Sequence, residues 1–185
     1  MFTRTTLLAA AAALPLMFGA AQAQDNPTVG GATMLADQPI AVNASNAPNL
    51  TTLVAAVTAA GLVDTLAGDG PFTVFAPTNA AFAALPAGTV DTLLQPENKG
   101  QLTKVLLSHV VPGRLDAQSL VNQISRAGGR LSLETASGNT IVLSQVSSQR
   151  LGVTDESGNT VNTRTFDVFQ SNGVVHVIDG VLLPQ

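Results

Sequence analysis

The chain contains the stretch Gly70-Pro-Phe-Thr-Val-Phe-Ala-Pro-Thr-Asn-Ala-Ala-Phe82, whose order of residues predicts a strand followed directly by a helix. Phe72 to Ala76 is a short apolar run of the kind that forms a buried strand, and Pro77 ends it. Thr78 then stands where a helix N-cap belongs. We therefore expect a strand over 72–76 and a short helix over 79–85.

A second stretch, Ser171-Asn-Gly-Val-Val-His-Val-Ile-Asp-Gly-Val-Leu-Leu-Pro184, predicts a turn at Asn172-Gly173 and a strand over 174–179. Together the two stretches resemble the two signature segments of fasciclin-like domains, which are modules of secreted and cell-surface adhesion proteins. The chain is similar to secreted bacterial members of this family, of the type found among mycobacterial immunogenic and adhesion proteins. The resemblance implies one fasciclin-like domain over 37–185.

The beginning of the chain predicts export. Arg4 precedes the apolar run 7–20, and Ala21-Gln22-Ala23 matches the small-x-small pattern of a signal peptidase site. We expect a signal peptide over 1–23, with cleavage between Ala23 and Gln24. The apolar run is too short for a comfortable membrane span, so we expect a secreted protein, extracellular or periplasmic. Residues 24–36 lack periodicity and are expected to form a flexible N-terminal extension.

Composition excludes several classes of partner and of stabilising bond. The chain has no cysteine, so the domain must be held together by burial and not by disulfides. Its 12 acidic and 8 basic residues give a net charge of −4, and no basic cluster is present. Nucleic acid and anionic lipid surfaces are therefore poor partners, because their binding depends on Lys and Arg. Trp and Tyr, which commonly stack on sugars, are also absent.

Helical patterns come first along the chain and strand patterns follow. The clearest helix begins after Asn49, its expected N-cap, and ends at Gly61. A helix over 89–94, a longer one over 97–110 and a short one behind Asp116 follow. The later segments with strand character are 131–135, 140–143, 150–153, 166–169 and 174–179. This order predicts an α+β domain. The resemblance implies a wedge-shaped β-sheet packed against several short helices, with the two signature segments adjacent in space.

The two histidines are expected to be structural. His109 continues the apolar stripe of the 97–110 helix, which predicts a buried histidine hydrogen-bonded to the backbone. His176 alternates with Val174 and Ile178 on one strand face. Two isolated histidines without cysteine do not make a zinc site, so we expect no metal.

The resemblance marks four positions as structural signature residues: Thr78, His109, His176 and Asp179. The family often carries a tyrosine directly before the first histidine, where this chain has Ser108. An adhesive role of that tyrosine-histidine pair therefore does not carry over to this chain.

No pattern of a catalytic site is present. Ser108 and His109 adjoin in sequence, but neighbours on a helix do not face each other. The chain has no Gly-x-Ser-x-Gly elbow and no glycine-rich phosphate loop, and its carboxylates are mostly scattered singly. We expect a protein that is not an enzyme and needs no cofactor.

The candidate binding unit is Asp167-Val168. Fasciclin-like adhesion domains often place an Asp-Ile pair at this point, and the resemblance implies a role in receptor binding for the matching pair. A carboxylate beside an exposed aliphatic side chain is a plausible recognition unit near the rim of the sheet. The alternative, an ordinary strand aspartate that faces water, remains open.

These observations predict a secreted, non-enzymatic and monomeric binding module. It would act in cell adhesion or surface attachment through contacts with a surface or extracellular-matrix protein. The alternative is a carrier of an apolar small molecule, a lipid or a pigment. The richness in Ala, Val and Leu would suit an apolar groove between helices and sheet.

Overall fold

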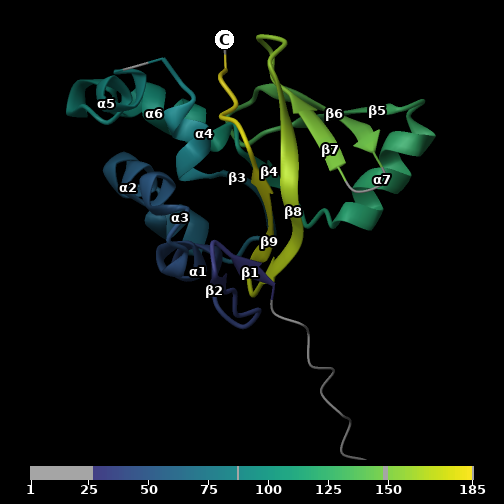
Figure 1. Ribbon diagram of the computed structural model, residues 1–185, viewed down its shortest axis with the longest axis horizontal. Helices are drawn as coiled ribbons and strands as arrows, with labels where there is room; N and C mark the ends of the chain where they lie inside the picture. The colour runs from purple at the N-terminus through teal and green to yellow at the C-terminus, as the bar shows by residue number, and fades with distance from the viewer. Residues whose placement is uncertain (1–26, 87, 148–149, 185) are drawn as a thin grey trace, which may run out of the picture.

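The computed structural model describes residues 27–86, 88–147 and 150–184 (Figure 1). The expected signal peptide and its cleavage point at Ala23 and Gln24 lie outside these residues. Among the residues that are described, no helix is long and apolar enough to cross a membrane.

Most helices come before most strands in the chain, as expected. The helices are α1 (Ile40–Asn46), α2 (Thr51–Ala60), α3 (Val63–Ala67), α4 (Asn79–Ala83), α5 (Thr89–Leu93), the 3-10 helix η1 (Pro96–Asn98), α6 (Lys99–Leu107) and α7 (Ala117–Arg126). The strands are β1 (Thr28–Val29), β2 (Ala32–Thr33), β3 (Phe72–Pro77), β4 (Val110–Pro112), β5 (Arg130–Glu134), β6 (Thr140–Ser147), β7 (Arg150–Thr154), β8 (Thr160–Gln170) and β9 (Gly173–Ile178). The α+β class is confirmed.

One mixed sheet organises the molecule. Its strands follow the order β4-β3-β9-β8-β7-β6-β5, while β1 and β2 form a separate pair. β3 runs parallel to β9, and the other neighbouring strands are antiparallel. The sheet curls so far that its two edge strands, β4 and β5, come close to each other. Ala136 N, just after β5, donates a hydrogen bond to Val110 O of β4 at 2.7 Å.

The two signature segments lie side by side at the centre of this sheet, as the resemblance implied. Phe72 pairs with Gly173, and the register continues to Pro77 and Ile178. Phe72 N also donates to Asn172 O at 3.1 Å. The backbones approach so closely that a Cβ on Gly173 would overlap Phe72 O, so only glycine fits there.

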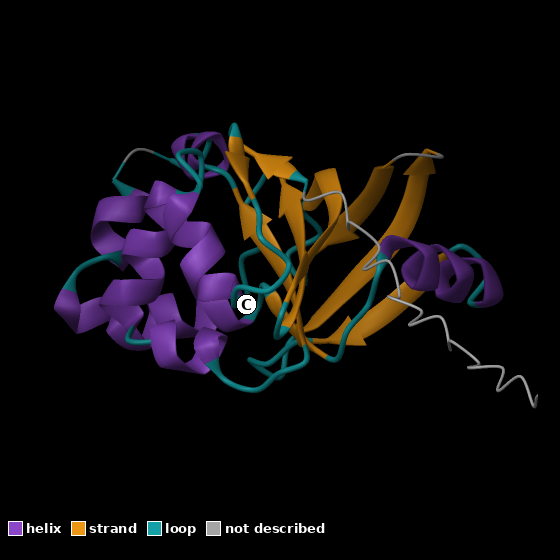
Figure 2. Cartoon of the chain, turned by 90° about the horizontal axis from the view of Figure 1, so that it is seen from below, coloured by secondary structure: helices purple, strands orange, loops and turns teal. Residues whose placement is uncertain are grey.

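Strand alternation divides the interior into two apolar clusters. Val74 and Ala76 of β3 pack toward helices α1, α2, α4 and α6, whereas Phe75 points to the opposite side. There it joins Leu120 and Ile124 of α7 inside the curl of the sheet. Figure 2 shows the resulting layers: most helices on one side, the sheet in the middle and α7 on the far side.

The N-terminal segment is part of the domain and not a flexible extension over its whole expected length. Residues 27–36 contain the β1–β2 pair, and Val29 and Met34 are only 3 % and 2 % exposed. Both side chains join the cluster under the helices. The expectation of a flexible extension over 24–36 is therefore wrong for the described residues 27–36, because two apolar side chains anchor them.

The cap of α2 comes from a residue distant in sequence. Asn79 Oδ1, at the start of α4, accepts a hydrogen bond from Thr52 N at 3.0 Å. Asn49 was the expected cap, but its buried Oδ1 has no partner among the described residues. The other expected caps are confirmed: Thr78 accepts from Ala81 N and Asp116 from Ser119 N.

The helix expected over 97–110 is shorter than its pattern suggested. α6 ends at Leu107, and Val110 to Pro112 form β4 against β3. The apolar pattern runs through α6 and β4 without a turn residue between them. A prediction from sequence alone therefore makes the helix too long.

Candidate functional site

The second half of β8 separates two environments. Its alternate residues Val168 and Gln170 are buried, at 0 % and 2 % exposure, and both line an internal cavity. Phe169, between them, points to the opposite face because successive side chains of a strand alternate, and Asp167 contacts α7 on that face. The expected pair Asp167-Val168 is thus not one exposed unit. Val168 belongs to the core, which corrects the expectation of an exposed aliphatic at this position.

Asp167 is held in an unusual conformation. Its φ is 53°, the only positive value among the non-glycine residues described. The pairing of β8 with β9 shifts register on either side of Thr165, which places a bulge here. Asp167 Oδ1 accepts a hydrogen bond from Ala117 N at 2.7 Å, at the positive N-terminal end of α7. The carboxylate is therefore half-buried and structurally bound, not freely solvated.

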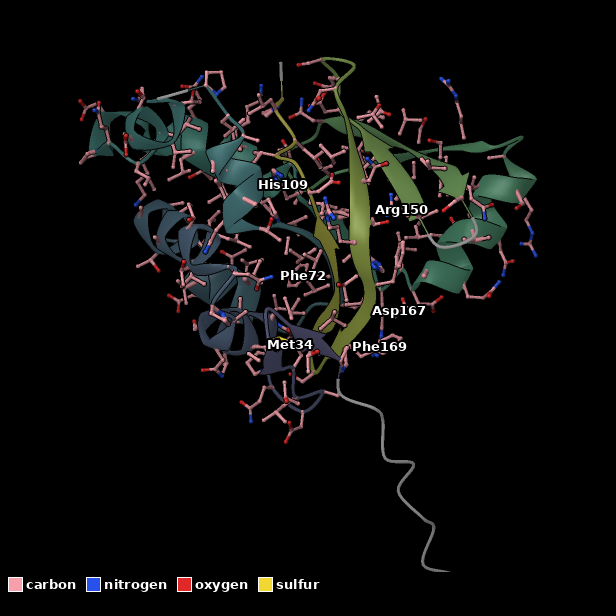
Figure 3. The ribbon with its side chains drawn as sticks, viewed as in Figure 1. Met34, Phe72, His109, Arg150, Asp167 and Phe169 are labelled. Atoms are coloured by element: carbon pink, nitrogen blue, oxygen red, sulfur yellow. The ribbon has the colours of Figure 1, made fainter. Side chains whose placement is uncertain are left out.

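Phe169 and Arg114 form a second feature of the outer face. The Arg114 guanidinium lies 5.1 Å from the centre of the Phe169 ring, within the range of a cation–π contact. Phe169 belongs to neither of the apolar clusters found in the described chain, and it is half-buried beneath an exposed arginine. Figure 3 shows Phe169 and Asp167 along the same stretch of β8. We call Arg114, Asp167 and Phe169 the outer β8 face.

His176 supports this face from within. It is fully buried and lies between the rings of Phe75 and Phe166, at 5.6 and 5.9 Å between centroids. Its Nε2 donates to Leu115 O at 2.9 Å, and Asp167 N donates to its Nδ1 at 3.4 Å. Burial lowers the pKa of His176 below its ordinary value, so the ring is neutral. The histidine thus holds the loop before α7 and the bulge of β8 together.

His109 is a core histidine bonded to the backbone, as expected. Nδ1 donates to Val105 O at 2.8 Å, and Nε2 accepts from Leu182 N at 2.9 Å. Burial lowers the pKa of His109 to about 4. Both ring nitrogens are engaged by backbone, so the residue has none left for catalysis. The neighbouring Ser108 is also turned elsewhere: its Oγ donates to Lys104 O and meets Ser137 Oγ.

The remaining signature residue, Asp179, fixes a strand end. Its Oδ1 accepts from Asn162 N at 2.8 Å, and its Oδ2 lies 3.5 Å from the Arg164 guanidinium. Within the ranges that the structure covers, no group of three or more His, Cys, Asp or Glu could hold a metal ion.

Asn172 has a role that sequence reasoning missed. It was expected only as a turn residue, yet its Nδ2 donates to Leu66 O and Gly68 O, and its Oδ1 accepts from Ile40 N. The amide thereby ties the β8–β9 turn to α1 and the end of α3. A turn asparagine looks alike in sequence whether or not its side chain reaches other elements, so no signal could have revealed this.

The inner side of β8 faces an apolar cavity of about 170 Å³. It lies between α1, α2 and α3 on one side and β3, β8 and β9 on the other. The composition of the chain suggested such a groove, and the structure places one where helices and sheet meet. Val168, expected as a surface contact, is part of its wall.

Comparison with known proteins relates the chain to one family. The sequence pattern of the fasciclin domain matches residues 48–184. Protein sll1483 of Synechocystis sp. is 49 % identical over 135 residues, which are 72 % of this chain and 66 % of that protein. Immunogenic protein MPB70 of Mycobacterium bovis is 41 % identical over 166 residues, covering 86 % of this chain and 76 % of the relative. The cell surface glycolipoprotein MPB83 of the same species is 36 % identical over 174 residues, covering 90 % and 70 %.

The fold also has a solved counterpart. A FAS1 domain pair from the insect cell adhesion molecule fasciclin I superposes with a TM-score of 0.68 at 19 % identity. The match covers 79 % of this chain and 51 % of that one, so the present chain spans about half of the solved pair. At this identity the likeness concerns the fold alone.

Proposed function

The chain belongs to the fasciclin domain family, and from this premise we propose that it is a secreted, non-catalytic module that attaches to a surface or extracellular-matrix protein. The signal-like residues 1–23 support export. The relative MPB83 is named a cell surface glycolipoprotein, which favours the same compartment.

One observation carries the proposed site: an arginine stacked on an aromatic ring that is not needed in either apolar cluster. Arginine and aromatic residues are enriched in protein interfaces and supply much of their binding energy. The half-buried Asp167 adds a carboxylate to the same face. A partner that offers a small apolar surface and a hydrogen-bond donor would match this outer β8 face.

An attachment assay tests the proposal. Purified protein is titrated onto intact producing cells and onto candidate matrix proteins, with Phe169→Ser compared to wild type. We expect roughly tenfold weaker attachment or more, because a central interface aromatic is lost.

The matched control is Val146→Ser, which removes an apolar side chain that is 57 % exposed on β6. It should attach like wild type. Equal attachment by Phe169→Ser and wild type, at equal melting temperature, would overturn the outer β8 face as the attachment site.

A further inference from the structure

The cavity beneath the helices is long as well as apolar. Phe72, Val74 and Ala76 of β3 all line it, and four residue steps along a strand span about 13 Å. Figure 3 labels three wall residues, Met34, Phe72 and His109, which are spread along the helix side of the sheet. A volume of about 170 Å³ drawn out over this length describes a narrow channel.

The described interior of the channel has no side chain that could stabilise a charged ligand group. Among the described residues of its wall, only His109 can ionise, and both of its nitrogens are taken by backbone. Gln170 is hydrogen-bonded to the buried amide of Asn43. Burying an unpaired charge in such surroundings is strongly unfavourable. The group that fills the channel must therefore be uncharged, and the mostly aliphatic wall favours a hydrocarbon.

The volume is sufficient for a ligand. An engineered apolar cavity of about 150 Å³ stays dry and takes up benzene. The present cavity is of similar size but drawn out, so an unbranched chain fits its shape better than a ring. Each methylene removed from water adds roughly 0.8 kcal/mol to binding, equivalent to about a fourfold gain in affinity.

Apart from the hydrogen-bonded His109 and Gln170, the polar residues of the described wall lie where it reaches solvent. The exposed wall residues Ser45 of α1, Thr58 of α2 and Thr65 of α3 mark this mouth. Ser45 Oγ donates to Ala41 O and Thr58 Oγ1 to Val54 O, both at 2.8 Å. Their protons are thus used, and their lone pairs are left to accept a hydrogen bond.

No basic side chain in the described mouth would balance the charge of an anion. The described wall contains no Lys or Arg, and the exposed Asp64 lies on the same short helix α3 as the wall residues Val63 and Thr65. A carboxylate head group would find no basic partner there, whereas a hydroxyl group can donate to the oxygens of Ser45 and Thr58. An uncharged head group with a hydroxyl is therefore the best match.

We propose that the channel binds a single unbranched hydrocarbon chain that carries an uncharged hydroxyl head group, as in a long-chain alcohol or a monoacylglycerol. The chain lies along β3 with its end beside Val168, and the head group stays at the mouth between α1, α2 and α3. This inference goes beyond surface attachment and does not depend on it, because the outer β8 face is on the other side of the strand.

Calorimetric titration with n-alcohols from hexanol to dodecanol tests the proposal on the full exported protein. Affinity should rise about fourfold with each methylene and then level off once the channel is full. Decan-1-ol should bind at least tenfold more tightly than decanoate. No binding of decan-1-ol up to its solubility limit, stronger binding of toluene than of any alcohol, or equal affinity for decanoate would each overturn the proposal.

A pair of variants locates the site. Ala44→Phe places a ring into the wall on α1 and should weaken decan-1-ol binding at least tenfold. Ala55→Phe makes the same change on the exposed side of α2 and should bind like wild type. If Ala44→Phe does not fold, Ala41→Leu makes a smaller filling at the same wall. Unchanged binding by the folded filling variant would place the alcohol elsewhere and contradict the assignment.

Discussion

At the scale of single residues, Asp167 shows how a motif read from sequence differs from its place in space. The expected recognition unit joined it to Val168, but a strand directs neighbours to opposite faces. Asp167 also stabilises the start of α7 and occupies a left-handed conformation that Asn and Gly tolerate better than Ala.

Three substitutions at Asp167 should therefore differ in stability. Asp167→Ala loses the hydrogen bond to Ala117 N and keeps the strained φ, so it should lower the free energy of unfolding by about 1–2 kcal/mol. Asp167→Asn keeps an acceptor and tolerates this φ, so its loss should stay below about 1 kcal/mol. Asp167→Gly relieves the strain but loses the bond. Urea unfolding measures all three, and an alanine variant as stable as the asparagine variant would refute this role.

His109 makes the stability of the fold depend on pH in the acid range. Its pKa is lowered to about 4 in the fold, against about 6.5 in an unfolded chain. Between these values the unfolded state binds more protons, so stability is present above pH 6.5 and is lost as the pH falls toward 4. The loss from His109 amounts to at most about 3 kcal/mol, and His176 acts in the same direction.

His109→Gln provides the test. Its amide retains a donor and an acceptor for Val105 O and Leu182 N but does not titrate. The slope of unfolding free energy against pH between 6.5 and 4.5 should be clearly smaller than in wild type. Identical slopes in both proteins would show that His109 does not cause the acid sensitivity.

At the scale of elements, Asn79 takes the capping role that the sequence predicted for Asn49. Asn79 Oδ1 caps α2 at Thr52 N, and its Nδ2 donates to Pro48 O and Thr51 Oγ1. Asn79→Ala should lower stability by about 1–2 kcal/mol. Asn49→Ala should cost less than about 0.5 kcal/mol or even stabilise, because the buried Asn49 Oδ1 has no partner within the described part of the chain. The reverse order in thermal unfolding would support the cap expected from sequence.

Elements with local signals were predictable, and those made by distant contacts were not. The Thr78 and Asp116 caps and the Gly61 end of α2 follow from residue types alone. α1 has no side-chain cap and buries the polar Asn43, so no local pattern marks it. β4 is a strand only because β3 lies beside it.

The candidate site was predictable in part, for the same reason. The positions of His109 and His176 in the core follow from apolar periodicity, and the structure bears them out. Arg114 and Phe169 are 55 residues apart along the chain, and the loop before α7, held through Leu115 by Thr73 and His176, brings them together. The bulge that turns Asp167 toward α7 likewise depends on the register between β8 and β9.

At the scale of the whole molecule, the N-terminal strand pair belongs to the domain and to the channel. Met34 is 2 % exposed and lines the cavity wall. Met34→Ala should lower stability by about 2–5 kcal/mol and weaken decan-1-ol binding. A chain that begins at Asp37 should lose at least as much free energy of unfolding as Met34→Ala. Equal stability of the shortened and the exported protein would restore the view of a flexible extension.

We expect the outer β8 face to attach the protein to its partner. Because the chain has no cysteine, one introduced cysteine carries a photo-crosslinker at a single known place. Gln118→Cys lies on α7 beside the Asp167 contact, and Gln101→Cys lies on α6, across the sheet (Figure 1). Crosslinking on producing cells should give an adduct from position 118, abolished by Phe169→Ser, and none from position 101. An adduct from position 101 alone, or one from position 118 that persists with Phe169→Ser, would rule out the outer β8 face as the attachment site.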